Sequence, residues 1–134
     1  MNENEISKII ADCAIEVHRV LGGPGLLESV YEEALVFELE QRGLNVQRQV
    51  FVPIIYKGNT LSSPLRMDVM IDNKVIVECK ALITYHIIFE IQLLTYLRLT
   101  GMKLGLVINF GETLVSKGIH RVVNGCSQQL KQRR

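Results

Sequence analysis

The stretch RMDVMIDNKVIVECKA, residues 66–81, predicts two β-strands joined by a tight turn. Apolar and β-branched side chains dominate both halves, and Asp72-Asn73-Lys74 between them has the composition of a turn. The second half, 75–81, is almost continuously apolar, which favours a strand buried on both faces. We therefore expect this segment to form the centre of a sheet.

Three charged side chains, Asp68, Glu78 and Lys80, interrupt these otherwise apolar strands. Residues two apart in a strand share a face, so Glu78 and Lys80 point the same way as Ile76, while the odd-numbered residues of 75–79 point the other way. Burying two charges on a strand this apolar is costly unless something compensates for them. The pattern therefore requires a partner for these charges.

A metal ion is the partner that the spacing favours. If the turn at 72–74 is three residues long and the strands are antiparallel, Asp68 lies opposite Glu78, with Cβ atoms ~5 Å apart. Two carboxylates so placed repel each other, which raises one pKa unless a cation holds them. Mg²⁺ prefers oxygen ligands and keeps several waters, so two carboxylates and a main-chain carbonyl would suffice.

Lys80 adds the second part of a hydrolytic centre. An ammonium group beside a metal-bound carboxylate pair can position or deprotonate a water, or stabilise the charge that builds on a phosphate. The alternative is a Glu–Lys pair that is solvated or bridged at a strand end, which E-x-K alone would favour. The aspartate at the matching register and Gln92 on the following helix favour the catalytic interpretation.

The rest of the chain predicts one α/β domain over residues 1–134 with a mixed sheet. Helical spacing at 6–21 and 26–42 predicts an N-terminal helical hairpin, hinged at GGPG (22–25). The elements expected after it are strands at 45–56, 65–71 and 75–81, a helix at 86–100, strands at 103–110 and 119–124, turns at 57–59 and 72–74, and a polar basic tail at 127–134.

Glu28 opens the second helix directly after the glycine-rich hinge. The helix dipole alone explains an acidic residue there, yet Glu28 could also be a further direct or water-mediated metal ligand. Tyr31 shares its helical face and either packs under the hinge or hydrogen-bonds Glu28. His18 reaches the site only if the hairpin folds over the sheet, and a lone helix histidine is more often structural or exposed.

Gln92 and Tyr96 are four residues apart and share a helical face with Phe89 and Leu99. We expect this stripe to be partly apolar and directed to the core, so that Gln92 needs a hydrogen-bonding partner. Either Gln92 caps a neighbouring main chain and Tyr96 is ordinary packing, or both reach the site and orient Lys80 or a substrate phosphate.

The composition is that of a globular protein, with 48% hydrophobic and 22% charged residues and a formal net charge of +1. This balance argues against a surface coated in nucleic-acid-binding charge. A solvated surface explains most of the basic residues equally well as contact with nucleic acid does. The candidate contact residues are Arg48, Lys57, Arg66, Arg98, Lys131, Arg133 and Arg134.

Three cysteines, Cys13, Cys79 and Cys126, lie far apart in the sequence. They form neither a C-x-x-C pair nor an even set, so a reduced, intracellular setting fits them best. The N-terminus is unlike a signal peptide, and no apolar run approaches the ~18 residues of a membrane span. We therefore expect a cytoplasmic protein with no membrane partner.

The segment GLLESVY at 25–31 fits Gly-x-x-Glu-x-x-Tyr and resembles the signature of the GxxExxY family of small bacterial and archaeal proteins. The resemblance extends over roughly residues 9–124. It includes EVHRVL, LLESVYEEAL, RMDVMIDNKVIVECKA, IQLLTYLRLTG and LGLVINF. That family is placed in the PD-(D/E)xK nuclease-like superfamily, which implies a restriction-endonuclease-like αβββαβ core.

The resemblance implies a role for each acidic site residue. Asp68 matches the metal-binding aspartate of the superfamily, Glu78 and Lys80 match its E-x-K pair, and Glu28 matches the acidic residue on the preceding helix. Cys79 stands where leucine is usual, which leaves its main-chain carbonyl available as a metal ligand, although its thiol could bind soft metals. The hinge reads LGGPG where relatives have LGPG, so one residue is expected to bulge there.

The segment Gln92-Leu-Leu-Thr-Tyr96 resembles the Q-x-x-x-Y motif of the RecB-type branch of that superfamily. In that branch the helix steadies the site and touches the nucleic acid. The resemblance therefore places Gln92 with the catalytic residues and Tyr96 beside the substrate.

These observations favour a Mg²⁺- or Mn²⁺-dependent nuclease that cleaves phosphodiester bonds in DNA or RNA. The modest charge supports an alternative, a catalytically silent binding module with the nuclease fold that acts with a nucleic-acid or protein partner. The small size supports a third, a nuclease subunit that works as a homodimer or with a larger DNA-tracking protein.

Overall fold

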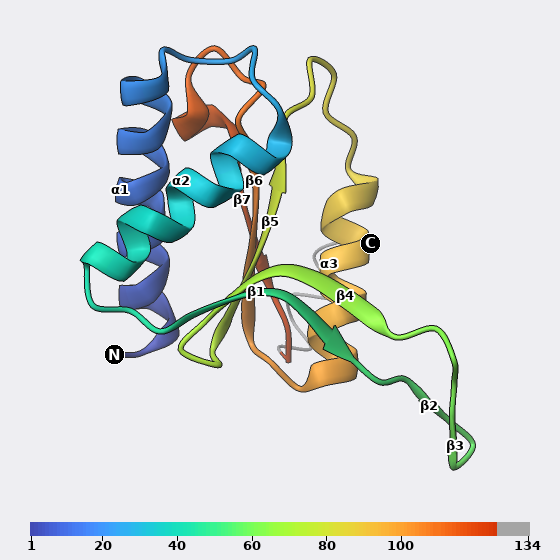
Figure 1. Cartoon of the computed structure of the whole chain (residues 1–134). Coiled ribbons are helices and arrows are strands. Elements are labelled where there is room, and N and C mark those ends of the chain that lie inside the picture. Colours follow the sequence, from blue (N-terminus) through green and yellow to red (C-terminus); the bar gives the residue numbers. More distant parts are fainter. Residues whose placement is uncertain (126–134) are drawn as a thin grey trace.

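The computed structural model describes residues 1–125 and places a five-stranded sheet between two helical layers (Figure 1). The helices α1 and α2 cover one face of the sheet, and α3 covers the other. The elements are α1 (Glu3–Leu21), α2 (Glu28–Gln41), β1 (Val46–Val52), β2 (Ile55–Tyr56), β3 (Asn59–Thr60), β4 (Leu65–Ile71), β5 (Val75–Lys80), α3 (Ile88–Thr100), β6 (Leu104–Asn109), a 3₁₀ turn η1 (Val115–Gly118) and β7 (Ile119–Val123).

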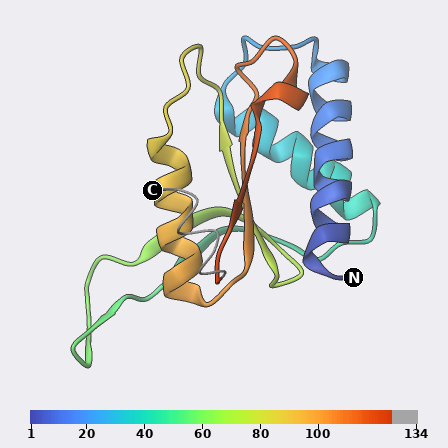
Figure 2. The same cartoon turned by 180° about the vertical axis from the view of Figure 1, so that it is seen from behind.

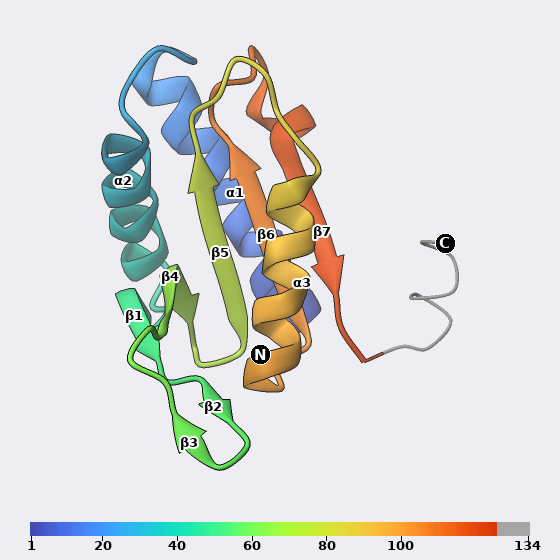
Figure 3. The same ribbon diagram turned by 90° about the vertical axis from the view of Figure 1, so that its right-hand side faces the viewer.

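The strand order in the main sheet is β1-β4-β5-β6-β7, so β5 is central (Figure 3). β5 and β6 are parallel, and the other neighbours are antiparallel. The prediction of a mixed sheet with 75–81 at its centre is confirmed. The parallel pair needs a crossover, which α3 supplies on one face.

The turn at 72–74 sets the register of β4 and β5 as the sequence predicts. Ile71 pairs with Val75, and Val69 pairs with Val77. Asp72 and Asn73 both adopt positive φ, a conformation that short polar side chains tolerate in tight turns. Continuing this register by one residue places Asp68 opposite Glu78.

Two apolar clusters lie on either side of the sheet. They are enclosed by the helices that Figure 2 shows on its two faces. The odd-numbered residues of β5 pack against α1 and α2, whereas Ile76 packs toward α3 with Leu93 and Leu97. All of these side chains are buried. The alternation predicted from the sequence is therefore confirmed, and Glu78 and Lys80 share the α3 side.

The prediction of one strand over 45–56 is wrong, because β1 ends at Val52 directly before Pro53. Proline lacks the N–H that a continuing ladder requires. The chain instead leaves the sheet as an arm that carries β2 and β3 (Figure 3). Its turn is Lys57-Gly58, both with positive φ, so the expected turn at 57–59 is one residue too long.

The helix boundaries also differ from the predictions by one to three residues, and α1 begins at Glu3 instead of residue 6. α2 begins at Glu28 instead of residue 26, after a hinge in which Gly22, Gly23 and Gly25 all have positive φ. α3 begins at Ile88 instead of residue 86, because the His86 ring accepts a hydrogen bond from the Ile88 N–H. No helix within residues 1–125 is long and apolar enough to cross a membrane. The tail 127–134, with Lys131, Arg133 and Arg134, and Cys126 lie outside the described residues.

Candidate active site

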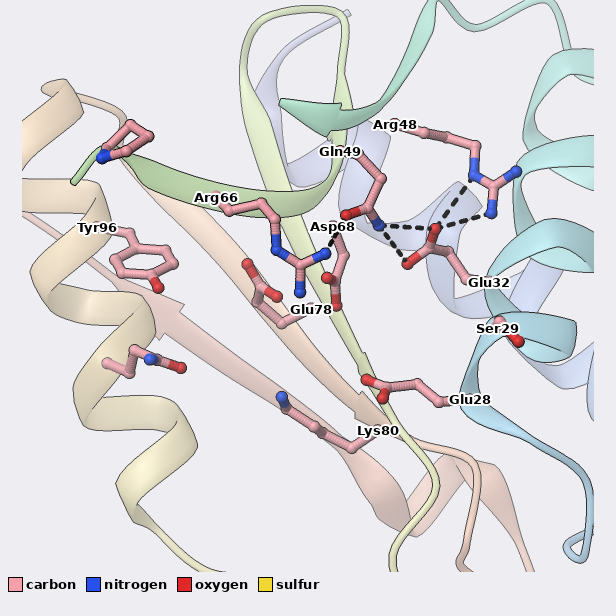
Figure 4. A pocket seen from close by; sticks show the side chains of 12 residues that line it. Glu28, Ser29, Glu32, Arg48, Gln49, Arg66, Asp68, Glu78, Lys80 and Tyr96 are labelled. Atoms are coloured by element: carbon pink, nitrogen blue, oxygen red, sulfur yellow. Dashed lines mark hydrogen bonds and ion pairs between the residues drawn. The ribbon is translucent and has the colours of Figure 1, made fainter. Parts of the chain in front are cut away.

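A polar pocket of about 640 Å³ opens at the carboxyl end of β5, where α2, the edge of the sheet and α3 converge (Figure 4). One helix and two strands, α2, β4 and β5, contribute its acidic side chains and its lysine. Its lining consists of Glu28, Ser29, Glu32, Arg48, Gln49, Pro64, Arg66, Asp68, Glu78, Lys80, Gln92 and Tyr96. The pocket thus brings together most of the residues predicted to act.

Asp68 and Glu78 form the buried floor of this pocket, and each side chain is only 7% exposed. The β4–β5 ladder ends at Val69 and Val77, one step before the two acids. Beyond this point the Cys79 N–H donates a hydrogen bond to the Asp68 side chain, at 3.1 Å from Oδ2. The strands therefore part at the point where the carboxylates need room.

Burial and, to a lesser extent, the neighbouring Asp68 charge together raise the pKa of Glu78 to about 9. Glu78 Oε1 is buried and has no hydrogen-bond partner within the described residues. A buried acceptor without a partner costs about 1–3 kcal/mol. A cation bound between the two acids would remove both the repulsion and the unsatisfied atom, so the residues present fit a divalent metal ion.

Glu28 completes the acidic rim from the first turn of α2. Burial raises its pKa, while Lys80 lowers it and Asp68 raises it, which shows that the three groups share one electrostatic environment. Within residues 1–125, however, no three His, Cys, Asp or Glu side chains form a group ready to hold a metal. The geometry fits an ion held by two carboxylates with waters in its remaining positions.

Lys80 is half-buried at the end of β5 and extends toward α3. Its Nζ lies 4.7 Å from the centroid of the Phe89 ring, a cation–π contact. Phe89 is in turn tilted against Tyr85, with ring centroids 5.8 Å apart. Phe89 was expected only as part of an apolar stripe, and its contact with the lysine adds a support that the sequence did not indicate.

The helix α3 brings Gln92 and Tyr96 to the pocket, but not as a core-directed stripe. The Gln92 side chain is exposed to the pocket and makes no hydrogen bond within the described residues. The alternative in which it caps a neighbouring main chain therefore does not hold. Leu99 on the same face is 54% exposed, because Leu93 and Leu97 form the face that packs on the sheet. For Tyr96, burial and the charges of the acidic pair raise the pKa.

Tyr31 packs under the hinge instead of bonding Glu28. Its ring is fully buried and stacks on Phe110 at 4.7 Å. Its hydroxyl donates to Gly23 O at 2.7 Å and accepts from Leu26 N–H at 3.2 Å. Tyr31 therefore supports the loop before Glu28 and is too buried to contact a substrate.

His18 has a structural position on the same side of the sheet. Its Nε2 donates to the Phe110 carbonyl at 3.1 Å, and the ring is buried. The hairpin does fold over the sheet, yet it carries His18 to the α1 face and not into the pocket.

The Cys79 thiol also lies on the α1 and α2 side, fully buried in the apolar cluster. Burial holds its pKa well above the usual range, and Cys13 is likewise buried and free. The thiol therefore cannot reach the pocket to bind a soft metal. Only the main chain of Cys79 faces the acidic pair, and its carbonyl remains a predicted ligand.

Four residues on the α2 side of the pocket form a network that the sequence did not indicate as a unit. Glu32 accepts from Arg48 and from the Gln49 amide, and Gln49 in turn accepts from Arg66 (Figure 4). Glu32 and Gln49 were not predicted as site residues, because neither belongs to a recognisable spacing. Among the expected contact residues, Lys57 and Arg98 do not line the pocket.

Asn109 is a further residue that sequence reasoning missed. It is fully buried at the end of β6, where it pairs with Lys80. Its side chain accepts from the N–H groups of Leu82 and Gly111 and donates to the Leu82 carbonyl. These bonds fix the chain directly after Lys80. The sequence Ile108-Asn109-Phe110-Gly111 at the end of an apolar strand gives no indication of them.

Comparison with known proteins gives one finding. A family model described as the PD-(D/E)XK nuclease superfamily matches residues 4–122. No curated protein and no solved structure matches the chain. The mixed five-stranded sheet with its three helices agrees with the restriction-endonuclease-like fold of such proteins.

Proposed function

The chain belongs to the PD-(D/E)XK nuclease superfamily, and on that premise we propose that it is a Mg²⁺- or Mn²⁺-dependent nuclease that hydrolyses phosphodiester bonds in DNA or RNA. We also assign it to the GxxExxY branch, on the motif that ends at Tyr31. The observation that carries the proposal is the buried Asp68–Glu78 pair, in which Glu78 Oε1 has no partner within the described residues.

Asp68 and Glu78 would hold the divalent ion, together with the main-chain carbonyl of Cys79. When bound, Mg²⁺ acts as a Lewis acid that polarises the phosphate and lowers the pKa of a nearby water. The Cys79 N–H donates to Asp68 and holds that carboxylate in one orientation. A carboxylate fixed in this way needs no reorganisation when the ion binds.

Lys80 would position the attacking water and stabilise the negative charge that builds on the phosphate. The Phe89 ring limits the conformations of its long side chain through the cation–π contact. Glu28 lines the same pocket and would accept a hydrogen bond from a water near the ion.

Gln92 and Tyr96 support the reaction from α3. The Gln92 amide has no hydrogen bond within the described residues, so it is available to orient water or phosphate. Tyr96 presents a half-buried ring at the pocket wall, where it can contact a sugar or base of the strand. The role of Tyr96 needs a substrate that reaches beyond the scissile phosphate.

The test is cleavage of a labelled panel of single- and double-stranded DNA and RNA, with Mg²⁺ or Mn²⁺ and with EDTA. Asp68→Ala and Lys80→Ala should each abolish cleavage that the wild-type protein shows only with metal. If the wild type and Lys80→Ala cleave at the same rate, the activity belongs to a contaminant and the proposal fails.

Calorimetry distinguishes the proposed enzyme from a silent binding module. A nuclease should bind Mn²⁺ at up to millimolar concentration, and Asp68→Ala should lose that binding. Absence of metal binding in the wild type, together with retained binding of an oligonucleotide, would favour the binding module.

A further inference from the structure

Glu32 is a buried carboxylate whose hydrogen-bonding capacity is already used. It is 5% exposed on α2, and it accepts from Arg48 Nε at 3.1 Å and Arg48 Nη2 at 2.9 Å. It also accepts from Gln49 Nε2 at 3.2 Å. The charge of Arg48 is therefore neutralised by Glu32, and little of it is left for a ligand.

Gln49 has an unusual backbone in the middle of β1. Its φ is +51°, although neither a turn nor a glycine is present there. Neighbouring strand residues normally point to opposite faces, yet the side chains of Arg48 and Gln49 both reach Glu32. The left-handed conformation breaks the alternation, and such strain in a well-ordered strand often marks a functional position.

Arg66 is held by the other end of the Gln49 amide. Gln49 Oε1 accepts a hydrogen bond from Arg66 Nη1. Arg66 lies two residues before Asp68 on β4, so both side chains point to the pocket. Figure 4 shows Arg66 among the side chains that line the pocket, with its guanidinium bonded to Gln49.

The hydrogen-bonding partner of Arg66 is the neutral Gln49 amide, whereas the partner of Arg48 is the Glu32 carboxylate. Within residues 1–125 the Arg66 side chain forms no ion pair, and its only hydrogen bond goes to Gln49. A guanidinium has five N–H donors in a rigid planar fork, so most of them remain available. Gln49 orients its positive charge, and no ion pair within residues 1–125 neutralises it.

We propose that Arg66 binds a non-bridging oxygen of the substrate phosphate, and that Glu32 and Gln49 hold it in position to do so. This inference rests on the proposed nuclease function and names the group that binds its phosphate. The fork of an arginine matches two phosphate oxygens, which a lysine cannot do. Gln49 is a positioning residue, because it acts only through Arg66.

The first test compares Arg66→Ala with Arg98→Ala, which removes an equal charge from an exposed position outside the pocket. Steady-state cleavage of the best substrate in the panel gives KM and kcat. Arg66→Ala should raise KM by about 10–100-fold, the effect of losing a hydrogen-bonded charge. Arg66→Lys should recover part of this loss, and Arg98→Ala should remain near the wild type.

The second test is Gln49→Gly, which accepts a positive φ without strain but cannot reach Arg66. We expect a KM about tenfold higher and an unfolding temperature equal to or above that of the wild type. A merely structural role would lower the unfolding temperature and leave KM unchanged. Fluorescence anisotropy of a labelled oligonucleotide, with Ca²⁺ in place of Mg²⁺, measures the affinity for the substrate without cleavage.

Two results would overturn the inference: equal effects of Arg66→Ala and Arg98→Ala, or a wild-type KM and oligonucleotide affinity for Gln49→Gly. These results are separable from failure of the nuclease function. If Asp68→Ala is inactive while Arg66→Ala binds and cleaves as the wild type does, the nuclease function stands and the phosphate assignment fails.

Discussion

The face of β5 that packs on α1 and α2 is entirely apolar, whereas the face toward α3 carries Glu78 and Lys80. Both faces belong to one six-residue strand and are equally well enclosed along its first half. The apolar face meets a helical hairpin that covers it fully, including the Cys79 thiol. The other face loses its cover where α3 begins, and the pocket opens there.

The difference teaches how a small domain can separate stability from chemistry on one strand. Alternation puts every second side chain into the α1 and α2 cluster, which stabilises the strand. The side chains between them can then be unfavourable for folding, as the unpartnered Glu78 oxygen is. Changes on the two faces should therefore have opposite consequences for stability and activity.

The largest effects are expected from substituting one residue on each face of β5. Lys80→Met keeps the length of the side chain but removes its charge, and it should lower the cleavage rate by about 10²–10³-fold. Val77→Ala on the opposite face should lower the free energy of unfolding by about 2–3 kcal/mol, with normal cleavage per folded molecule. Urea unfolding and cleavage assays on both variants measure the two effects. Equal loss of activity in the two would contradict the separation.

Glu78→Gln should inactivate the protein and yet stabilise its metal-free form. The pKa of Glu78 is raised to about 9, so folding favours its protonated form. The cost of ionisation is absent below its unfolded pKa and grows as the pH rises toward 9. At pH 8 in EDTA, Glu78→Gln should therefore gain about 1–3 kcal/mol over the wild type.

Unfolding of Glu78→Gln and the wild type as a function of pH checks the sign. The wild type should lose stability with rising pH, by at most about 1.4 kcal/mol per pH unit. The variant should show a flatter profile, and Mn²⁺ should stabilise only the wild type. A variant that is less stable than the wild type at pH 8 in EDTA would be evidence that Glu78 is already satisfied.

Asn109→Ala should affect both faces, because it removes the bonds that fix the chain after Lys80. Leaving these buried main-chain groups unpaired should cost about 1–3 kcal/mol. The cleavage rate should fall by less than in Lys80→Met, since the ammonium group is still present. Asn109→Asp keeps both acceptor bonds and loses the donor, so it should lie between Asn109→Ala and the wild type in thermal unfolding.

The smallest effect is expected from Tyr31→Phe on the α1 and α2 side. It removes the hydroxyl bonds to Gly23 and Leu26 and leaves the ring stacked on Phe110. The free energy of unfolding should fall by about 1 kcal/mol, and cleavage per folded molecule should stay at the wild-type level. A large loss of activity would mean that Tyr31 contributes to the site directly.

The sequence predicted that Asp68 and Glu78 lie opposite each other, because this prediction needs only turn length and strand alternation, which are both local. A three-residue turn and strand alternation suffice to place Asp68 opposite Glu78, and the structure has that register. The strand predicted over 45–56 is wrong at Pro53. The apolar composition of the segment indicates a strand throughout, but proline lacks the N–H that continues a sheet. Likewise, the periodicity of α3 identified an apolar stripe but not which side of the helix meets the sheet.

The network of Glu32, Gln49 and Arg66 could not be predicted in the same way. Its members come from α2, β1 and β4, and their contact depends on how the edge strand lies against the helix. The positive φ of Gln49 carries no sequence signal, since glutamine is not a residue that favours it. Asn109 was missed for a related reason, because its partner Leu82 follows the neighbouring parallel strand.

The most direct test of the account is a crystal structure of the protein soaked in Mn²⁺, with the anomalous signal of the metal recorded. The account predicts one ion between the carboxylates of Asp68 and Glu78, close to Glu78 Oε1, and no such peak in Asp68→Ala crystals. A wild-type map at millimolar Mn²⁺ without a peak at this position would contradict it.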